Sequence, residues 1–337
     1  MVRLVAFLLA LVSCDGFSHS RAILRPKQSK LFAFTNNFAD NVEAGLLTIF
    51  KPKEVTRVVE AWRRMRKNED VNNQLAMYNV DGDGYHRLAK QVANSYLSDL
   101  EPVKCFHPNE AFPWTKALED SWSDINAELL SIIGDEAKLS QGSNVWVGPL
   151  GGDEVAQAYG EKWKTLGLYD RAEWEETNIN LFPVTTKALA TSGCPLVEAL
   201  FARMSPGSEI KAHSDMSNFV LTAHLGVQVP TTTEEGGEPC CWIQVGNERR
   251  HWENGKMLVF DTSVLHEAAN EHASEDRHVL MLRFWHPLTT EAERGALQFI
   301  FDACADAELV SSEGQLFLYD QLASARAGYY GDLLAKL

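Results

Sequence analysis

Cysteine is scarce in this chain of 337 residues, and none of its six cysteines forms a Cys-x-x-Cys pair. A zinc-finger framework and a dense disulfide scaffold are therefore excluded. Positive charge is also in deficit, because 31 Lys and Arg stand against 46 Asp and Glu, a formal net charge of −15. Since such a surface repels phosphate backbones, nucleic acid is not an expected partner. The hydrophobic content of 45% is ordinary for a globular chain with a sizeable core.

The adjacent cysteines Cys240 and Cys241 leave two interpretations open. Neighbouring side chains of a strand point to opposite faces, which predicts that both thiols simply pack. In an oxidising compartment, either thiol could instead form a disulfide with another cysteine.

Long apolar runs are missing too, since a membrane span needs about 20 apolar residues. The run from Leu4 to Val12 is shorter, follows Arg3 and precedes small and turn-forming residues, as in a secretory signal peptide. We expect a signal peptide over residues 1–16 and a disordered or transit-like lead-in over 17–38. The signal peptide predicts the ER lumen or secretion. Because the lead-in begins rich in Ser, Arg and Lys, import into a plastid by a signal plus a transit peptide is the alternative.

Residues 39–142 show apolar positions at helical spacing, which predicts a helical region that packs on the rest of the chain. One helix is expected over residues 55–62. Another is expected to begin after Pro113 and to end at Gly134. A poorer pattern predicts a helix over residues 88–96.

Residues 79–84, with the sequence Asn-Val-Asp-Gly-Asp-Gly, are similar to the front of a calcium-binding loop. Lys90 stands where such a loop carries its bidentate glutamate, so a principal ligand is missing. The segment is therefore interpreted as a solvated turn.

From residue 143 to 290 the pattern changes to short strands bounded by Pro and Gly, without intervening helices. This density of strands predicts a sandwich or small barrel rather than a parallel α/β sheet. The tail, 291–337, returns to a helical pattern. We expect a mainly β fold with flanking helices that share one core. The expected strands cover 199–204, 219–229, 241–245, 249–252, 256–260 and 278–285.

The candidate chemistry lies in this strand-rich region. His213 and Asp215 are two residues apart, so both side chains project from one face of an extended segment. His266 follows the apolar strand 257–260 and supplies a third donor. Two histidines and a carboxylate on one side of an ion form the ligand set of non-haem Fe(II) oxygenases. Eleven residues later Arg277 opens the last strand, where a guanidinium can grip the far end of a dicarboxylate through two hydrogen bonds.

Several motifs occur in order along the stretch 201–287, namely Met204-Ser205-Pro206-Gly207, His224-Leu225-Gly226, Trp252-Glu253-Asn254-Gly255-Lys256, Phe260-Asp261, His266-Glu267 and Trp285-His286-Pro287. With these motifs the stretch resembles the aspartyl/asparaginyl β-hydroxylase family. The resemblance implies a double-stranded β-helix, or jelly roll, that uses Fe(II), 2-oxoglutarate and O2. The implied reaction couples oxidative decarboxylation of 2-oxoglutarate to hydroxylation of a C–H bond, on aspartyl or asparaginyl residues of a peptide or protein.

The resemblance also implies roles for single residues. His213 and His266 match the iron-binding histidines, while Arg277 and His224 match residues that contact 2-oxoglutarate. Asp215 occupies a position that is glycine in some members and aspartate in others, which makes it a candidate third ligand.

Two positions depart from the family pattern. Ala202 stands where many members have a serine that hydrogen-bonds 2-oxoglutarate. Thr222 stands where an arginine usually holds the carboxylate of the substrate. These changes leave the reaction class in place but weaken the prediction of an aspartyl or asparaginyl substrate.

Three other functions stay open. One is a 2-oxoglutarate oxygenase that acts on a small molecule or a free amino acid, which Thr222 favours. A second is a non-catalytic jelly roll that binds a metal or ligand, although the set of His213, Asp215, His266 and Arg277 is intact. A third is a zinc hydrolase, because two histidines and a carboxylate also bind zinc. Hydrolysis would leave Arg277 unexplained.

Overall fold

The computed structural model describes six ranges of the chain and Tyr319. The expected signal peptide, the turn after Asn79 and the end of the tail lie outside the described residues. Helix α2 (Asn36–Ile49) begins within the expected lead-in 17–38. The described ranges are 36–67, 74–79, 86–100, 104–148, 158–231 and 239–311.

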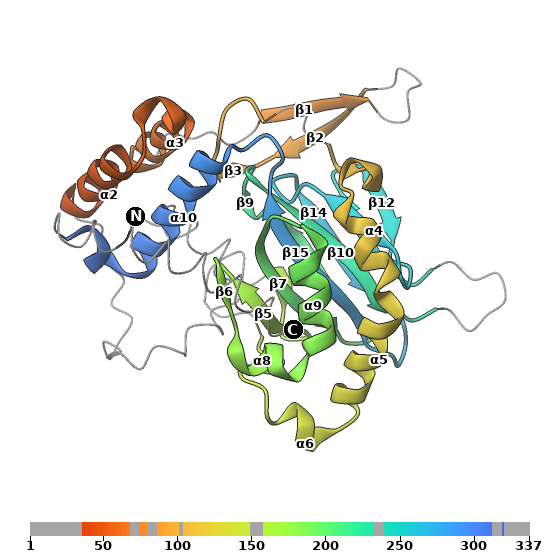
Figure 1. Cartoon of the computed structure of the whole chain (residues 1–337). Helices are drawn as coiled ribbons and strands as arrows, with labels where there is room; N and C mark the ends of the chain where they lie inside the picture. The colour runs from red at the N-terminus through yellow and green to blue at the C-terminus, as the bar shows by residue number, and fades with distance from the viewer. Residues whose placement is uncertain are drawn as a thin grey trace.

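Two antiparallel sheets facing each other form the centre of the fold (Figure 1). In the described part of the chain, the larger sheet has the order β4-β13-β10-β15-β7-β5-β6 and the smaller one β12-β11-β14-β8. From β7 onward the chain passes repeatedly from one sheet to the other, which is the topology of a jelly roll. The predicted mainly β fold with a double-stranded β-helix is therefore confirmed.

Six strands lie close to the bounds expected after residue 196, whereas the strands over 208–213 and 266–270 were not expected. The larger sheet contains β4 (Phe106–His107), β5 (Trp163–Asp170), β6 (Glu173–Trp174), β7 (Leu196–Met204), β10 (Val220–Gln228), β13 (Met257–Phe260) and β15 (Arg277–Trp285). The smaller sheet contains β8 (Ser208–His213), β11 (Cys241–Val245), β12 (Glu248–His251) and β14 (His266–Asn270). Two further pairs are β1 (Gln74–Asn79) with β2 (His86–Gln91), and β3 (Ala93–Ser95) with β9 (Met216–Ser217).

Four helices cover the outer face of the larger sheet (Figure 1). They are α4 (Trp114–Asp120), α5 (Trp122–Ile133), α8 (Glu176–Leu181) and α9 (Pro183–Ser192). Apolar residues at helical spacing, such as Ile125 and Leu129 of α5, pack in one core with outward-facing strand residues such as Phe201 and Leu280. The inner faces of the two sheets form a separate core, which contains the site described below.

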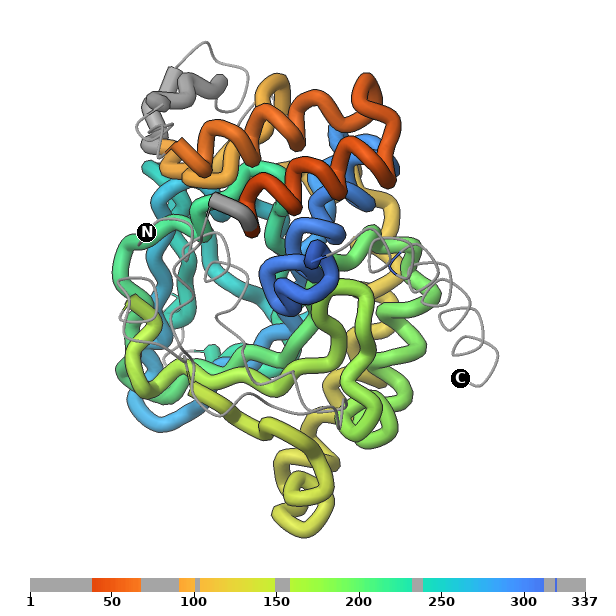
Figure 2. The backbone as a smooth tube through the Cα atoms, turned by 90° about the vertical axis from the view of Figure 1, so that its left-hand side faces the viewer, coloured from red at the N-terminus to blue at the C-terminus, as the bar shows by residue number. Residues whose placement is uncertain are grey.

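A second group of helices packs at one edge of the sheets. Figure 2 shows α2 and α3 (Thr56–Arg66) side by side, with α10 (Glu291–Ala305) next to them. Helix α10 begins with a capping box between Thr290 and Glu293, and Glu293 also pairs with Arg57 of α3. The remaining short helices are α6 (Glu136–Leu139), η1 (Pro52–Glu54), η2 (Asn109–Ala111) and η3 (Ala307–Val310).

Three expectations need correction. The segment between Pro113 and Gly134 forms two helices, not one, with a break at Ser121. The Ser121 hydroxyl donates to the Ala117 carbonyl, a bond that often bends helices. The prediction of a helix over 88–96 is wrong, because residues 86–91 and 93–95 form strands. Burial there alternates from residue 91 to 97 with the period of two that is typical of a strand.

Helices α8 and α9 were missed in a region expected to hold only strands. Pro183 occupies the first turn of α9, where its fixed φ suits a helix. Gly193 ends that helix in the left-handed conformation at φ 80°.

Cys240 and Cys241 are buried and their thiols are free, as the packing interpretation predicted. Within the described ranges, no helix has the length and apolarity that a membrane crossing requires.

Candidate functional site

His213, Asp215 and His266 meet between the two sheets. His213 is the last residue of β8, and the register of the smaller sheet places it directly opposite His266, the first residue of β14. Asp215 follows β8, where its backbone N–H donates to the carbonyl of Thr262 at 2.9 Å. One donor atom from each of the three side chains lies within 4.8 Å of the other two.

Backbone carbonyls determine the tautomer of both histidines. Nδ1 of His213 lies 2.7 Å from the Lys211 carbonyl, and Nδ1 of His266 lies 2.9 Å from that of Val264. A carbonyl only accepts hydrogen bonds, so each Nδ1 carries the proton and each Nε2 offers a lone pair. Burial lowers the pKa of His213 to about 4 and also lowers that of His266. Both rings are therefore neutral at pH 7, which is the form that binds metals.

The Asp215 carboxylate is ionised although it is buried. Burial raises its pKa, but opposing effects that include the charge of Arg283 and a hydrogen bond with Thr262 outweigh this, so the pKa lies below the ordinary value. Oδ1 lies 3.8 Å from Nε2 of His213 and accepts a hydrogen bond from the Tyr159 hydroxyl at 3.4 Å. Two imidazole nitrogens and one carboxylate oxygen form the donor set of a non-haem Fe(II) site, which the residues present therefore fit.

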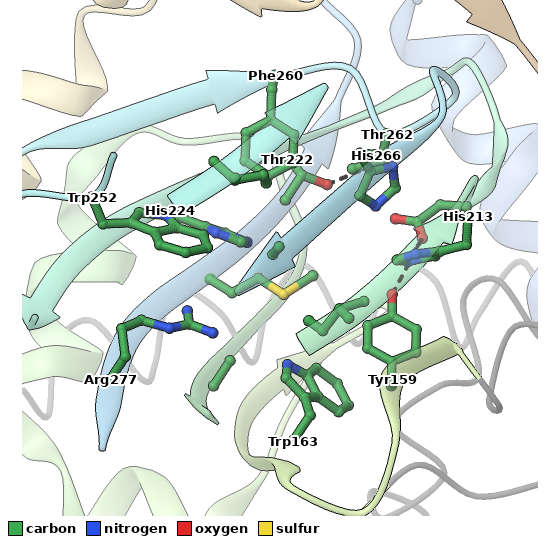
Figure 3. Close-up of a pocket in the computed structure, with 16 residues that line it drawn as sticks. Tyr159, Trp163, His213, Thr222, His224, Trp252, Phe260, Thr262, His266 and Arg277 are labelled. Carbon is green, nitrogen blue, oxygen red and sulfur yellow. Dashed lines mark hydrogen bonds and ion pairs between the residues drawn. The ribbon is translucent and has the colours of Figure 1, made fainter. Parts of the chain in front are cut away.

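Arg277 and His224 lie beside Trp252 at the other end of the same pocket (Figure 3). The guanidinium carbon of Arg277 lies 4.4 Å from the Trp252 ring centre, and the ring of His224 stacks on Trp252 at 5.8 Å. Nε and Nη1 of Arg277 and both ring nitrogens of His224 have no hydrogen-bond partner among the residues that the structure describes. Burial lowers the pKa of Arg277 to about 10, so it stays cationic at pH 7.

A buried cation without a partner is costly, so this end of the pocket is built for an anion. The carboxylate of 2-oxoglutarate fits that requirement, because it accepts two parallel hydrogen bonds from a guanidinium. The pocket and its open mouth together have a volume of about 440 Å³.

All five residues predicted from the sequence line this one pocket, namely His213, Asp215, His224, His266 and Arg277. The two departures from the family pattern, Ala202 and Thr222, line it as well. Thr222 donates from its hydroxyl to that of Thr262 at 3.4 Å, so a neutral side chain faces the cavity at this position.

Sequence reasoning missed several residues of the pocket. Tyr159 and Trp163 lie 4.5 Å apart between ring centres, and Tyr159 also lies edge-on to the His213 ring at 4.7 Å. Residues with high β-propensity, such as Trp163, Thr165 and Tyr169, could have indicated the strand that carries Trp163. Nothing local connects Tyr159 to a histidine 54 residues later. Arg283, which contacts Asp215, also went unnoticed.

Comparisons with known proteins agree with this architecture. Residues 119–287 match the family model described as aspartyl/asparaginyl beta-hydroxylase. The ornithine lipid ester-linked acyl 2-hydroxylase of Rhizobium tropici is 32% identical over 54% of this chain and 60% of its own. Aspartate beta-hydroxylase domain-containing protein 2 of Mus musculus is 40% identical over 42% of this chain and 40% of its own. Human aspartyl/asparaginyl beta-hydroxylase is 31% identical over 55% of this chain and 23% of its own. This chain thus aligns with 60% or less of the length of these relatives.

Proposed function

Because this chain belongs to the aspartyl/asparaginyl beta-hydroxylase family, we propose that it is an Fe(II)- and 2-oxoglutarate-dependent dioxygenase that hydroxylates a C–H bond. One observation carries the proposal. The donor atoms of His213, Asp215 and His266 converge within 4.8 Å in the pocket that also holds the buried guanidinium of Arg277. A metal and an anionic co-substrate therefore find their binding groups in one cavity.

Each residue has a defined part in this proposal. Nε2 of His213, Nε2 of His266 and Oδ1 of Asp215 hold the iron, which supplies the O2 chemistry when it is bound with 2-oxoglutarate. Arg277 binds the distal carboxylate of 2-oxoglutarate, and His224 contacts the same co-substrate. Apolar walls that include Ile243, Ala268 and Met281 exclude water around the reacting carbon.

The proposed substrate is an aspartyl or asparaginyl residue of a peptide or protein, as the names of two of the relatives suggest. A lipid acyl chain is the second candidate, because the relative from Rhizobium tropici is named as an acyl 2-hydroxylase. Thr222 weakens the case for an aspartyl or asparaginyl substrate, since it offers the pocket a neutral hydroxyl where the family resemblance implies an arginine. A free amino acid remains a third arm of the test.

The first experiment adds Fe(II) and 2-oxoglutarate to the full chain without O2 and records visible absorption. We expect a metal-to-ligand charge-transfer band, followed by succinate formation once O2 is admitted. His266→Ala removes a metal ligand and loses both signals, while Arg277→Ala mainly weakens 2-oxoglutarate binding. Arg203→Ala is the matched control, because Arg203 precedes the register partner of Arg277 on β7 and pairs with Asp276 outside the pocket.

The outcomes separate the possible functions. Succinate formation that is stimulated by aspartyl peptides, acyl lipids or free amino acids identifies the substrate class, and a mass increase of one oxygen atom verifies the product. Binding of both ligands without any turnover supports a non-catalytic module. Absence of both the charge-transfer band and succinate in the wild type contradicts the proposal.

A further inference from the structure

Arg283 is a second buried arginine of the site, and it contacts a proposed metal ligand rather than the cavity. Its side chain is 2% exposed, and its Nη2 donates to Oδ2 of Asp215 at 2.5 Å. Its Nε lies 3.6 Å from Oε2 of Glu198, whose side chain is 3% exposed. One guanidinium therefore bridges two buried carboxylates.

The register of the larger sheet explains this placement. Arg283 of β15 lies directly opposite Glu198 of β7 on one side and Thr222 of β10 on the other. Side chains of directly paired residues share a face, so all three project toward the smaller sheet. Asp215 arrives from that smaller sheet after β8. The contact between Arg283 and Asp215 thus joins the two sheets at the proposed metal site.

The two carboxylate oxygens of Asp215 have different contacts. Oδ2 accepts from Arg283, while Oδ1 faces Nε2 of His213 at 3.8 Å and accepts from Tyr159. Because a carboxylate is planar and rigid, holding Oδ2 also sets the direction of Oδ1. We propose that Arg283 is a positioning residue, which fixes Oδ2 so that Asp215 presents Oδ1 alone to the metal. This inference rests on the proposed function.

Glu198 offsets the positive charge of Arg283. A guanidinium beside a divalent ion repels it, and the repulsion is strong where water is excluded. The carboxylate of Glu198 offsets the charge of Arg283 from the side away from Asp215. Arg283 can therefore orient the metal ligand without placing a net positive charge against the metal.

The Arg283→Lys variant separates positioning from simple electrostatics. If Arg283 acted through its charge alone, Arg283→Lys would bind the metal like the wild type, because the charge that keeps Asp215 ionised is retained. If Arg283 positions Asp215, its removal weakens metal binding, because outer partners of metal ligands typically contribute about 10- to 100-fold in affinity.

The test is a titration of the metal-free full chain with Co(II), without co-substrate, followed by calorimetry and by the visible d–d absorption that reports coordination. We expect Arg283→Gln to weaken Co(II) binding by about 10- to 100-fold and to change the absorption. Arg283→Lys, which keeps the charge but not the planar fork, falls in between. In an Asp215→Asn background, Arg283→Gln causes no further loss.

Arg57→Gln is the matched control, because Arg57 bonds to the buried carboxylate of Glu293 on another element, away from the pocket. Its Co(II) affinity stays within about twofold of the wild type. Thermal unfolding checks that each variant folds, and if Arg283→Gln does not, Arg283→Lys carries the comparison. Wild-type or tighter binding by the folded variant overturns the inference and leaves the proposed function intact. Absence of Co(II) binding by the wild type instead contradicts the proposed function.

Discussion

Single residues of the pocket owe their chemical state to burial and to the groups around them. The neutral form of His213 results from burial, and its tautomer from the carbonyl of Lys211. The charge of Arg277 stays uncompensated among the described residues, while that of Arg283 is shared by two carboxylates. The two arginines are only six residues apart on one strand, yet one is available to a ligand and the other is not.

The contact of Trp252 with Arg277 leads to a specific prediction about co-substrate binding. Its ring lies under the guanidinium of Arg277 at 4.4 Å in a buried setting, where a cation–π contact contributes up to about 2 kcal/mol. We expect Trp252→Leu to weaken binding of 2-oxoglutarate to the Mn(II)-loaded chain by about tenfold, measured by calorimetry. Affinity for Mn(II) itself stays unchanged, because Trp252 contacts no proposed metal ligand.

Trp242→Leu is the control for this prediction. Trp242 stacks with Arg249 at 3.5 Å, but on β11 and β12, outside the pocket. Its substitution leaves 2-oxoglutarate binding at the level of the wild type. Equal affinities in Trp252→Leu and Trp242→Leu would show that the stacked tryptophan has no part in holding the co-substrate.

The path of strand β10 depends on one small residue, Gly226. A Cβ at Gly226 would lie 2.1 Å from the carbonyl oxygen of Glu253, which is backbone and cannot rotate away. The two segments also exchange hydrogen bonds, from Gly226 N–H to Lys256 and from Gly255 N–H to the Gly226 carbonyl. Glycine is therefore required here by close approach.

We expect Gly226→Ala to lower the free energy of unfolding by about 1 to 3 kcal/mol, because the backbone must shift to remove the overlap. Since His224 lies two residues earlier on the same strand, 2-oxoglutarate affinity falls as well. Urea unfolding at constant m-value measures the first effect. Gly148→Ala is the control, because a Cβ there meets open space. Unchanged stability of Gly226→Ala would contradict the account of this strand.

For the whole molecule, buried histidines make stability depend on pH. Burial lowers the pKa of four of them to between about 3 and about 4, namely His107, His213, His278 and His286. Between these values and the ordinary 6.5, the unfolded chain binds more protons than the folded one. Stability is therefore present above pH 6.5 and is lost as the pH falls toward 4. Asp261 acts in the opposite direction, because burial raises its pKa to about 6.

His107 allows this effect to be tested away from the pocket, at the edge strand β4 beside Phe112. The depressed pKa predicts that His107 alone accounts for about 2 kcal/mol of the stability lost between pH 7 and pH 5. We expect the metal-free His107→Gln variant to lose less stability over this interval than the wild type. Guanidinium unfolding at both pH values measures the difference, and equal losses in the two proteins would rule out this contribution.

How much could be predicted from the sequence differs between local and distant features. The helix at the start of the tail and six of the strands after residue 196 were predicted correctly from local patterns. The structure brings His213 and His266 together, while their role as metal ligands stays a prediction. The break at Ser121 and the helices α8 and α9 were not predicted. Their signals compete with one another locally, and packing on the larger sheet decides between them.

The amino-acid sequence by itself determined the change from helical to strand periodicity and the donors that a metal site requires, because spacing and side-chain chemistry are properties of neighbouring residues. Only the tertiary structure decided which groups share the cavity. Arg283 meets Asp215 across 68 residues of chain, and Tyr159 meets the same carboxylate across 56. Such contacts follow from strand register and from the facing of two sheets, which no local pattern encodes.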